Sequence, residues 1–242
     1  MATAVLAPQR PALVRFLDRY FYFSMSLLIA AVVVFGFGQT INHNLIHASP
    51  IPPFILTIHA IVFPGWVLFF ILQSALVRSR NVKLHRTLGW FGIALAVAIV
   101  VVGFLTARGM DRFLLTQPDA PFDMRAFMII QLTDLICFAV PFTLAISWRK
   151  RPEFHRRAVL VASCALTNAA FSRFPHMPLA WSPACVAFLI ALGAVRDYLV
   201  NRRVHKVYLY VLPLYIAFQV LSMHTYTHAS AWWVRIANVL LG

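Results

Sequence analysis

Residues 87–107 read TLGWFGIALAVAIVVVGFLTA and contain no charged side chain. A helix rises about 1.5 Å per residue, so a run of this length crosses the roughly 30 Å hydrocarbon core of a bilayer. Basic residues stand directly on both sides, Arg86 before the run and Arg108 after it. The stretch therefore predicts a transmembrane helix.

The composition of the whole chain supports the same class of protein. Of its 242 residues, 61% are hydrophobic and 12% are charged, and the mean hydropathy is +0.78. Such a chain has too few polar side chains to cover a water-soluble globule. We therefore expect a single all-α integral membrane domain over 1–242, a polytopic bundle with seven transmembrane helices at 19–38, 53–77, 87–107, 126–147, 156–174, 180–195 and 207–223. Because the sixth run is short, six spans are the alternative.

The distribution of lysine and arginine predicts the orientation of the bundle. Sixteen of the 21 lysines and arginines lie at the N-terminal end of the chain or in and directly beside the loops after the second, fourth and sixth runs, and five lie on the other side. Cations accumulate on the cytoplasmic side of membranes. The N-terminus is thus expected inside, with 1–18 as a cytoplasmic tail, and the C-terminus outside, with 229–242 as an outer interfacial tail.

The formal net charge of +14 does not indicate nucleic-acid binding, because the cations lie in short loops beside apolar runs. Anionic lipid headgroups are the expected partners of these loops, and other membrane subunits are a further class of partner. The three cysteines fall singly in three different runs, which is typical of small packing residues.

Three basic loops each contain a histidine at the predicted cytoplasmic start of a returning helix: His85, His155 and His205. Neutral imidazole is a ligand of haem iron and of transition metals. Together with His59, these histidines form the predicted cofactor set, and the cofactor expected there is haem b. The alternative is that each contacts lipid phosphate or caps its helix, because the neighbouring cations disfavour a further cation.

Two HxxxH pairs, His43 with His47 and His224 with His228, lie near the predicted outer ends of the first and seventh helices. On an α-helix this spacing places two imidazoles one turn apart, as chelation of zinc or another transition metal requires. If the first and last helices are neighbours, the two pairs converge beside His59. The alternatives are interfacial histidines and no cofactor at all.

His59 and Asp134 are ionisable residues inside apolar runs. Charge at that depth is costly, so such residues are functional candidates by default. Asp134 and Asp111 are the carboxyls predicted to act as a catalytic base beside an outer metal. Arg173, with Asn168 below it, is the predicted partner of Asp134, and a structural ion pair or a protonated Asp134 explains the same pattern.

Several stretches resemble a broad family of uncharacterised bacterial polytopic membrane proteins: LTIHAIVFPGW (56–66), LQSALVR (72–78), VKLHRTLGW (82–90), RPEFHRR (151–157), RFP (173–175), and the segment from Asp197 to His205. The resemblance covers about 56–210 and implies a helical bundle in the bacterial cytoplasmic membrane. It implies no activity.

Two weaker similarities suggest activities. The chain is similar to transmembrane b-type cytochromes, in which His59, His85 and His155 would match three haem ligands, although the fourth run lacks a histidine. His224 and His228 resemble part of the site of seven-span zinc amidohydrolases of the ceramidase and adiponectin-receptor kind. The leading hypothesis is electron transfer through haem b. The alternatives are an outward-facing metal-dependent lipid hydrolase and a non-enzymatic assembly factor or transporter.

Overall fold

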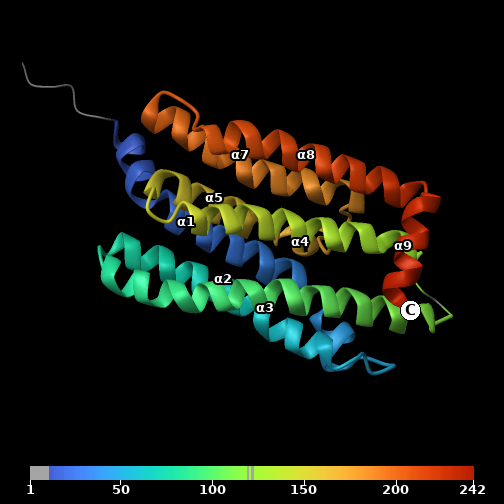
Figure 1. Ribbon diagram of the computed structural model, residues 1–242. Coiled ribbons are helices and arrows are strands. Elements are labelled where there is room, and N and C mark those ends of the chain that lie inside the picture. Colours follow the sequence, from blue (N-terminus) through green and yellow to red (C-terminus); the bar gives the residue numbers. More distant parts are fainter. Residues whose placement is uncertain (1–10, 119, 121–122) are drawn as a thin grey trace, which may run out of the picture.

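The computed structural model describes residues 11–118, 120 and 123–242, and the regular elements in this part of the chain are all helical (Figure 1). Six helices there are long and apolar enough to cross a membrane, which confirms a multi-pass helical membrane protein. They are α1 (Ala12–Gly38), α2 (Ile55–Arg78), α3 (Val82–Leu115), α4 (Met124–Ser147), α7 (Ser182–Asn201) and α8 (Lys206–Thr227). The shorter elements are η1 (Asn42–Ile46), α5 (Pro152–Ala165), α6 (Asn168–Phe171), η2 (Leu179–Trp181) and α9 (Ala231–Leu241).

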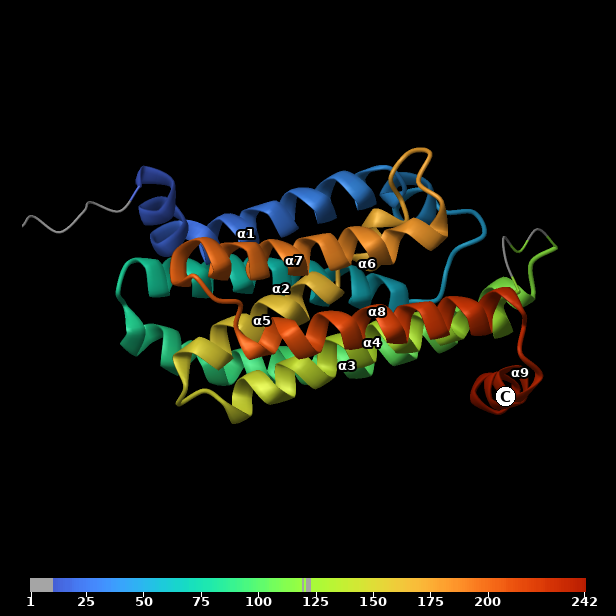
Figure 2. The same ribbon diagram turned by 90° about the horizontal axis from the view of Figure 1, so that it is seen from above.

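The six long helices form a closed ring in which α1, α2, α3, α4, α8 and α7 follow one another as neighbours. Helix α5 packs against α1, α4, α7 and α8 and lies inside this ring (Figures 1 and 2). Its residues 157–165 are buried except for Val159. A helix buried on nearly all sides is a core element, so α5 is the centre of the fold.

The fifth apolar run, 156–174, is not the continuous helix that the sequence predicts. Helix α5 ends at Ala165, a turn follows at 166–167, and α6 begins at Asn168. The Thr167 hydroxyl donates a 2.6 Å hydrogen bond to the Cys164 carbonyl. Threonine and asparagine side chains compete with helical backbone hydrogen bonds in this way, which accounts for a break at this point.

Glycine allows α6 to approach α1. A β-carbon on Gly36 would collide with the backbone carbonyl of Ala170, so no larger residue fits unless the two helices separate. Beyond α6, Phe174 packs edge-on against Phe35 with ring centroids 4.7 Å apart. These contacts keep the second half of the broken segment against α1 and away from the axis of α5.

The sixth run, short by sequence, belongs to a full-length helix. Helix α7 continues past Val195 to Asn201, through two buried charged residues, Arg196 and Asp197. The alternative of six spans was based on the short sixth run, but in the structure it is the fifth run that lacks a long helix.

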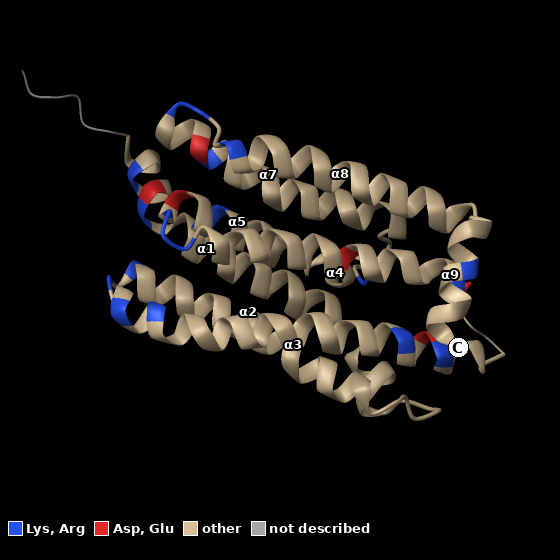
Figure 3. Cartoon of the chain, in the orientation of Figure 1, with Lys and Arg blue, Asp and Glu red and all other residues tan. Residues whose placement is uncertain are grey.

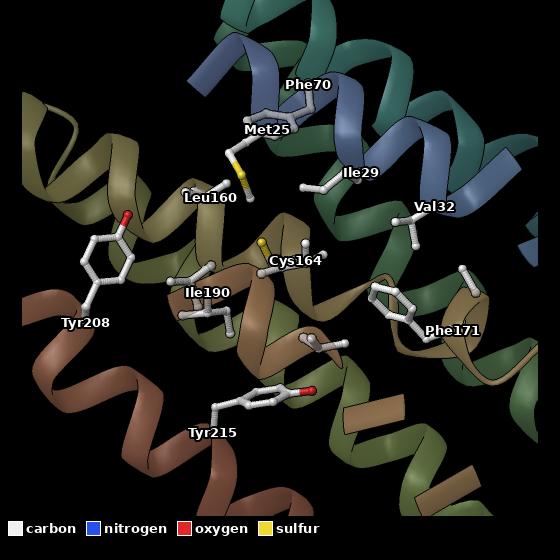
Figure 4. Packing of buried hydrophobic residues seen from close by; sticks show 14 of the residues in the cluster. Met25, Ile29, Val32, Phe70, Leu160, Cys164, Phe171, Ile190, Tyr208 and Tyr215 are labelled. Carbon is white, nitrogen blue, oxygen red and sulfur yellow. The ribbon is translucent and has the colours of Figure 1, made fainter. Parts of the chain in front are cut away.

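The largest core cluster surrounds α5 (Figure 4). Side chains from α1, α2, α5, α6, α7 and α8 meet there, among them Met25, Ile29, Val32, Phe70, Leu160, Cys164, Phe171, Ile190, Tyr208 and Tyr215. All three cysteines are free, and Cys164 is fully buried in this cluster. Because lipid is as apolar as these side chains, close packing, more than burial from water, stabilises such a core.

The two ends of the bundle differ in charge (Figure 3). The basic end carries the start of α1 and the α2–α3, α4–α5 and α7–α8 loops, and the α9 end carries the opposite connections and α9 (Figures 1 and 2). Of the predicted tail 1–18, residues 1–10 lie outside the described part, and α1 already begins at Ala12. The predicted tail 229–242 contains α9, which crosses the ends of α4 and α3 (Figure 1).

Candidate functional site

Asp134 lies near the middle of α4, ten residues after its first residue, Met124, or about 15 Å along the helix axis. Its two carboxylate oxygens accept hydrogen bonds of 3.1 and 2.9 Å from the Asn168 amide nitrogen. The Gln219 amide nitrogen donates a third, of 2.8 Å. The carboxyl group is therefore held between α4, α6 and α8.

The break between α5 and α6 positions Asn168, which is the first residue of α6. Asn168 and Gln219 are both buried, and Asp134 is partly buried. Three buried polar atoms nearby on these two helices have no hydrogen-bond partner: Asn168 Oδ1, Tyr215 Oη and Ser222 Oγ. An unsatisfied buried polar atom costs about 1–3 kcal/mol, so the site has unused capacity to bind water, a proton or another polar group.

The prediction that Arg173 pairs with Asp134 is wrong, and it is Asn168, named only for its place below Arg173, that contacts Asp134. The Arg173 guanidinium donates to the Ala169 carbonyl and lies 4.5 Å from the centroid of the Phe37 ring. Its burial lowers the pKa of Arg173. The amides of α6 and α8 thus supply the partners of Asp134.

Asp111 lies in α3 near the α9 end and is 1% exposed. One of its oxygens accepts a 3.1 Å hydrogen bond from the Gln131 amide nitrogen, and Gln131 precedes Asp134 by about one turn of α4. The other oxygen of Asp111 and the amide oxygen of Gln131 have no partner. Asp111 is therefore joined through Gln131 to the turn of α4 that precedes Asp134, whereas Asp134 itself meets α6 and α8.

A buried ion network at the basic end was missed by the sequence interpretation, which placed its cations among lipid headgroups. Asp197, which is 0% exposed, accepts two hydrogen bonds of 2.6 Å from Arg157 and one of 3.1 Å from Arg196. Arg196 also pairs with Asp18 at 2.9 Å. The network joins α1, α5 and α7. An arginine next to an aspartate within the sixth helix was its only signal in the sequence.

The four histidines predicted to bind haem do not form one group. The rings of His85 and His155 contact each other edge to face, with centroids 6.2 Å apart and ring planes at 76°, and His155 Nδ1 lies 2.9 Å from the Ala145 carbonyl oxygen. The ring of His59 instead stacks on that of Phe63, with centroids 3.8 Å apart. His85 Nδ1 is buried without a partner.

His205 has the capping role that was the alternative prediction. Its Nδ1 accepts a 3.2 Å hydrogen bond from the Val207 backbone N–H at the start of α8, and its ring packs against Phe154 at 4.5 Å. Burial lowers the pKa of His205, and the positive charge of Arg157 lowers it further. The neutral ring is therefore favoured, as an acceptor of a backbone N–H requires.

The two HxxxH pairs are not brought together. His43 lies in the π-helical turn η1 and His47 follows it, so these two are not on a regular α-helix; His47 Nδ1 lies 2.8 Å from Asn42 Oδ1. His224 and His228 do lie side by side, with centroids 4.2 Å apart. The predicted convergence fails because α7 separates α1 from α8 in the ring.

Within the described part of the chain, no three His, Cys, Asp or Glu side chains are grouped closely enough to hold a metal ion. The predicted zinc site of four or five histidines is therefore not formed. Comparison of the chain with protein-family models, curated proteins and solved structures gives no match. The polar group around Asp134 is the most developed candidate site.

Proposed function

We propose that the chain is a proton transporter of the bacterial cytoplasmic membrane and that Asp134 is its proton-binding group. The observation that carries this proposal is the carboxyl group in the middle of α4, bound by amides from a broken segment and from α8. Among the hypotheses from sequence, this favours the transporter over the haem protein and the lipid hydrolase.

The proposal includes seven membrane crossings. Residues 152–171, which comprise α5, the turn and α6, run from the basic end toward the α9 end (Figures 1 and 2). Twenty residues at about 1.5 Å each match a hydrocarbon core of roughly 30 Å. An odd number of crossings agrees with termini at opposite ends, and the cations put the basic end in the cytoplasm.

Reporter fusions test this topology. Fusions after Arg80, Arg151 and Arg203 are expected to report cytoplasm, and a fusion at Gly242 is expected to report the exterior. A cytoplasmic signal at Gly242 would contradict seven crossings.

The environment of Asp134 suits a group that exchanges a proton. A medium of low dielectric constant disfavours a charged carboxylate, whereas hydrogen bonds from two amides favour it. With these effects opposed, both protonation states are accessible. The amide N–H groups that point at the oxygens would repel a metal cation at the same position. Discontinuous helices that expose polar groups near the membrane centre also form the ion and substrate sites of many transporters.

Proton flux into vesicles tests the function. The purified protein is reconstituted into liposomes that contain a pH-sensitive dye, and a pH gradient is imposed. Wild type and Glu153→Gln, which removes an exposed carboxyl at the basic end, are expected to dissipate the gradient faster than protein-free vesicles. Asp134→Asn is expected to match protein-free vesicles. A wild-type rate equal to that of protein-free vesicles would contradict the proposal.

A second candidate function, binding of one haem b, rests on the proximity of the His85 and His155 rings, whose centroids are 6.2 Å apart. The contact of His155 Nδ1 with a backbone carbonyl leaves Nε2 to act as a ligand, an arrangement common among metal-binding histidines. The test is the dithionite-reduced visible spectrum of the purified protein. This function requires a Soret shift and an α band that His85→Ala removes, and a featureless wild-type spectrum excludes it.

A further inference from the structure

We propose that a polar pathway runs from the α9 end to Asp134 on the inner side of the ring, between α3, α4 and α8, and that α9 covers its entrance. This inference rests on the proposed function, because it supplies the route by which protons reach Asp134. In the proposed topology the α9 end is outside, so the route leads from the exterior.

Helix α8 contributes one wall of the pathway. Tyr215, Gln219, Ser222 and Thr225 are separated by three or four residues, which places them on one face of the helix, and all four are buried. The hydroxyl groups of Tyr215 and Ser222 have no hydrogen-bond partner. The opposite face is apolar and exposed, with Leu221 at 61%. Water or protons along this face would satisfy the hydroxyl groups that have no partner.

Helices α4 and α3 contribute the other wall. Gln131 lies about one turn from Asp134 toward the α9 end and donates to Asp111 of α3. The free oxygens of Gln131 and Asp111 leave acceptors for water on this side as well. Asp111 is therefore the carboxyl at the entrance, and Gln131 connects it to the level of Asp134.

On the side toward the basic end, the surroundings of Asp134 are apolar. Phe138, one turn further along α4, is 0% exposed and packs edge-on against Trp66 with centroids 5.1 Å apart. Leu160 and Val161 of α5 are also buried in the core. Of the α8 hydroxyl groups without partners, that of Ser222 lies toward the α9 end, that of Tyr215 belongs to the turn before Gln219, and that of Tyr208 lies nearer the basic end. We place the pathway on the α9 side, because Gln131 and Asp111 also have oxygens without partners there.

Helix α9 lies across the ends of α4 and α3 (Figure 1). The Trp233 indole N–H donates a 3.0 Å hydrogen bond to the Arg125 carbonyl, and Trp233 packs in a cluster with Met128 and Leu241. Trp233 is 5% exposed, whereas its neighbour Trp232 is 56% exposed. One side of α9 therefore holds it over the entrance, and the docking depends on Trp233.

Thiol labelling from outside tests the pathway and its cover. In a chain whose three native cysteines are replaced by alanine, Ser222→Cys is exposed to a membrane-impermeant, water-soluble thiosulfonate. Such reagents need the thiolate, which forms in contact with water. Ser222→Cys is expected to react slowly, and Leu221→Cys is expected not to react. Adding Trp233→Ala to Ser222→Cys is expected to raise the labelling rate at least about tenfold, because loss of a buried tryptophan favours undocking of α9. Trp232→Ala is the matched control and leaves the rate unchanged.

Equal labelling rates with Trp233→Ala and Trp232→Ala would overturn the role of α9. Absence of labelling of Ser222→Cys in every background would overturn the pathway. If Ser222→Cys does not elute as a monodisperse peak in size-exclusion chromatography, Thr225→Cys takes its place. Labelling does not require Asp134 to titrate. If Ser222→Cys labels as expected while Asp134→Asn still conducts protons, the pathway stands and the proposed function fails.

Discussion

The buried ion network at the basic end is the feature whose loss should most destabilise the fold. Asp197 accepts hydrogen bonds from Arg157 and Arg196, and all three side chains are buried. Asp197→Asn keeps the shape of the side chain but removes the negative charge. Arg157 then has no carboxylate partner, while Arg196 keeps Asp18.

The size of the effect follows from this geometry. Removing one partner of a buried ion pair typically costs about 3–5 kcal/mol, because an uncompensated charge stays buried. For a chain of this length, each kcal/mol lowers Tm by about 2–4 °C. We therefore expect Asp197→Asn to lower Tm by about 6–20 °C. Replacing both charges, as in Arg157→Met with Asp197→Leu, should restore most of this loss because neither charge is then left alone.

Thermal unfolding of the detergent-solubilised protein, followed by circular dichroism, measures these shifts. Glu153→Gln is the control, because Glu153 is an exposed carboxyl at the same end, and it should change Tm by no more than about 2 °C, as expected for a surface substitution. A shift for Asp197→Asn as small as that of the control would refute the assignment of a buried network. So would a double variant less stable than Asp197→Asn alone.

Two further predictions concern the α1–α6 contact and the cap of α8. Gly36→Ala should lower the free energy of unfolding by about 1–3 kcal/mol, because it forces α6 away from α1 at the Ala170 carbonyl. Gly38→Ala is the control and should leave stability unchanged, because there is open space around Gly38. Equal Tm values for the two variants would contradict this prediction. Burial and the charge of Arg157 lower the pKa of His205, although Asp197 and Glu153 oppose this. The contribution of the cap is therefore present above the unfolded value of about 6.5 and is lost as pH falls below it. His205→Asn keeps a capping side chain without the titration, so the drop in Tm between pH 8 and pH 5 should be smaller in this variant than in wild type, and an equal drop would argue against the cap.

The helical membrane class and six of the spans could be predicted from sequence, because apolar length alone determines whether a helix crosses a bilayer. The break at 166–167 could not, since hydropathy remains high through it and the local signal is only Thr167 followed by Asn168. Its position depends on contacts formed in the folded bundle, such as that of α6 with Gly36.

The candidate site was predicted in part for the same reason. Asp134 could be recognised because a carboxyl inside an apolar run is costly wherever it lies. Gln219 could not, because its meeting with Asp134 requires α8 to be the neighbour of α4. The convergence of the outer histidines was wrong because it assumed that the first and last helices are adjacent, and α7 lies between them in the ring.

The protonation of Asp134 is the central claim, and infrared spectroscopy measures it directly. A difference spectrum of the reconstituted protein between acid and alkaline pH should contain the carbonyl stretching band of a protonated carboxylic acid. We predict that Asp134→Asn removes one component of this band, to which the other carboxyls also contribute, and that Gln219→Leu, which deletes one donor to the carboxyl, shifts the frequency of that component. An identical band in wild type and Asp134→Asn would contradict the assignment of Asp134 as the proton-binding group.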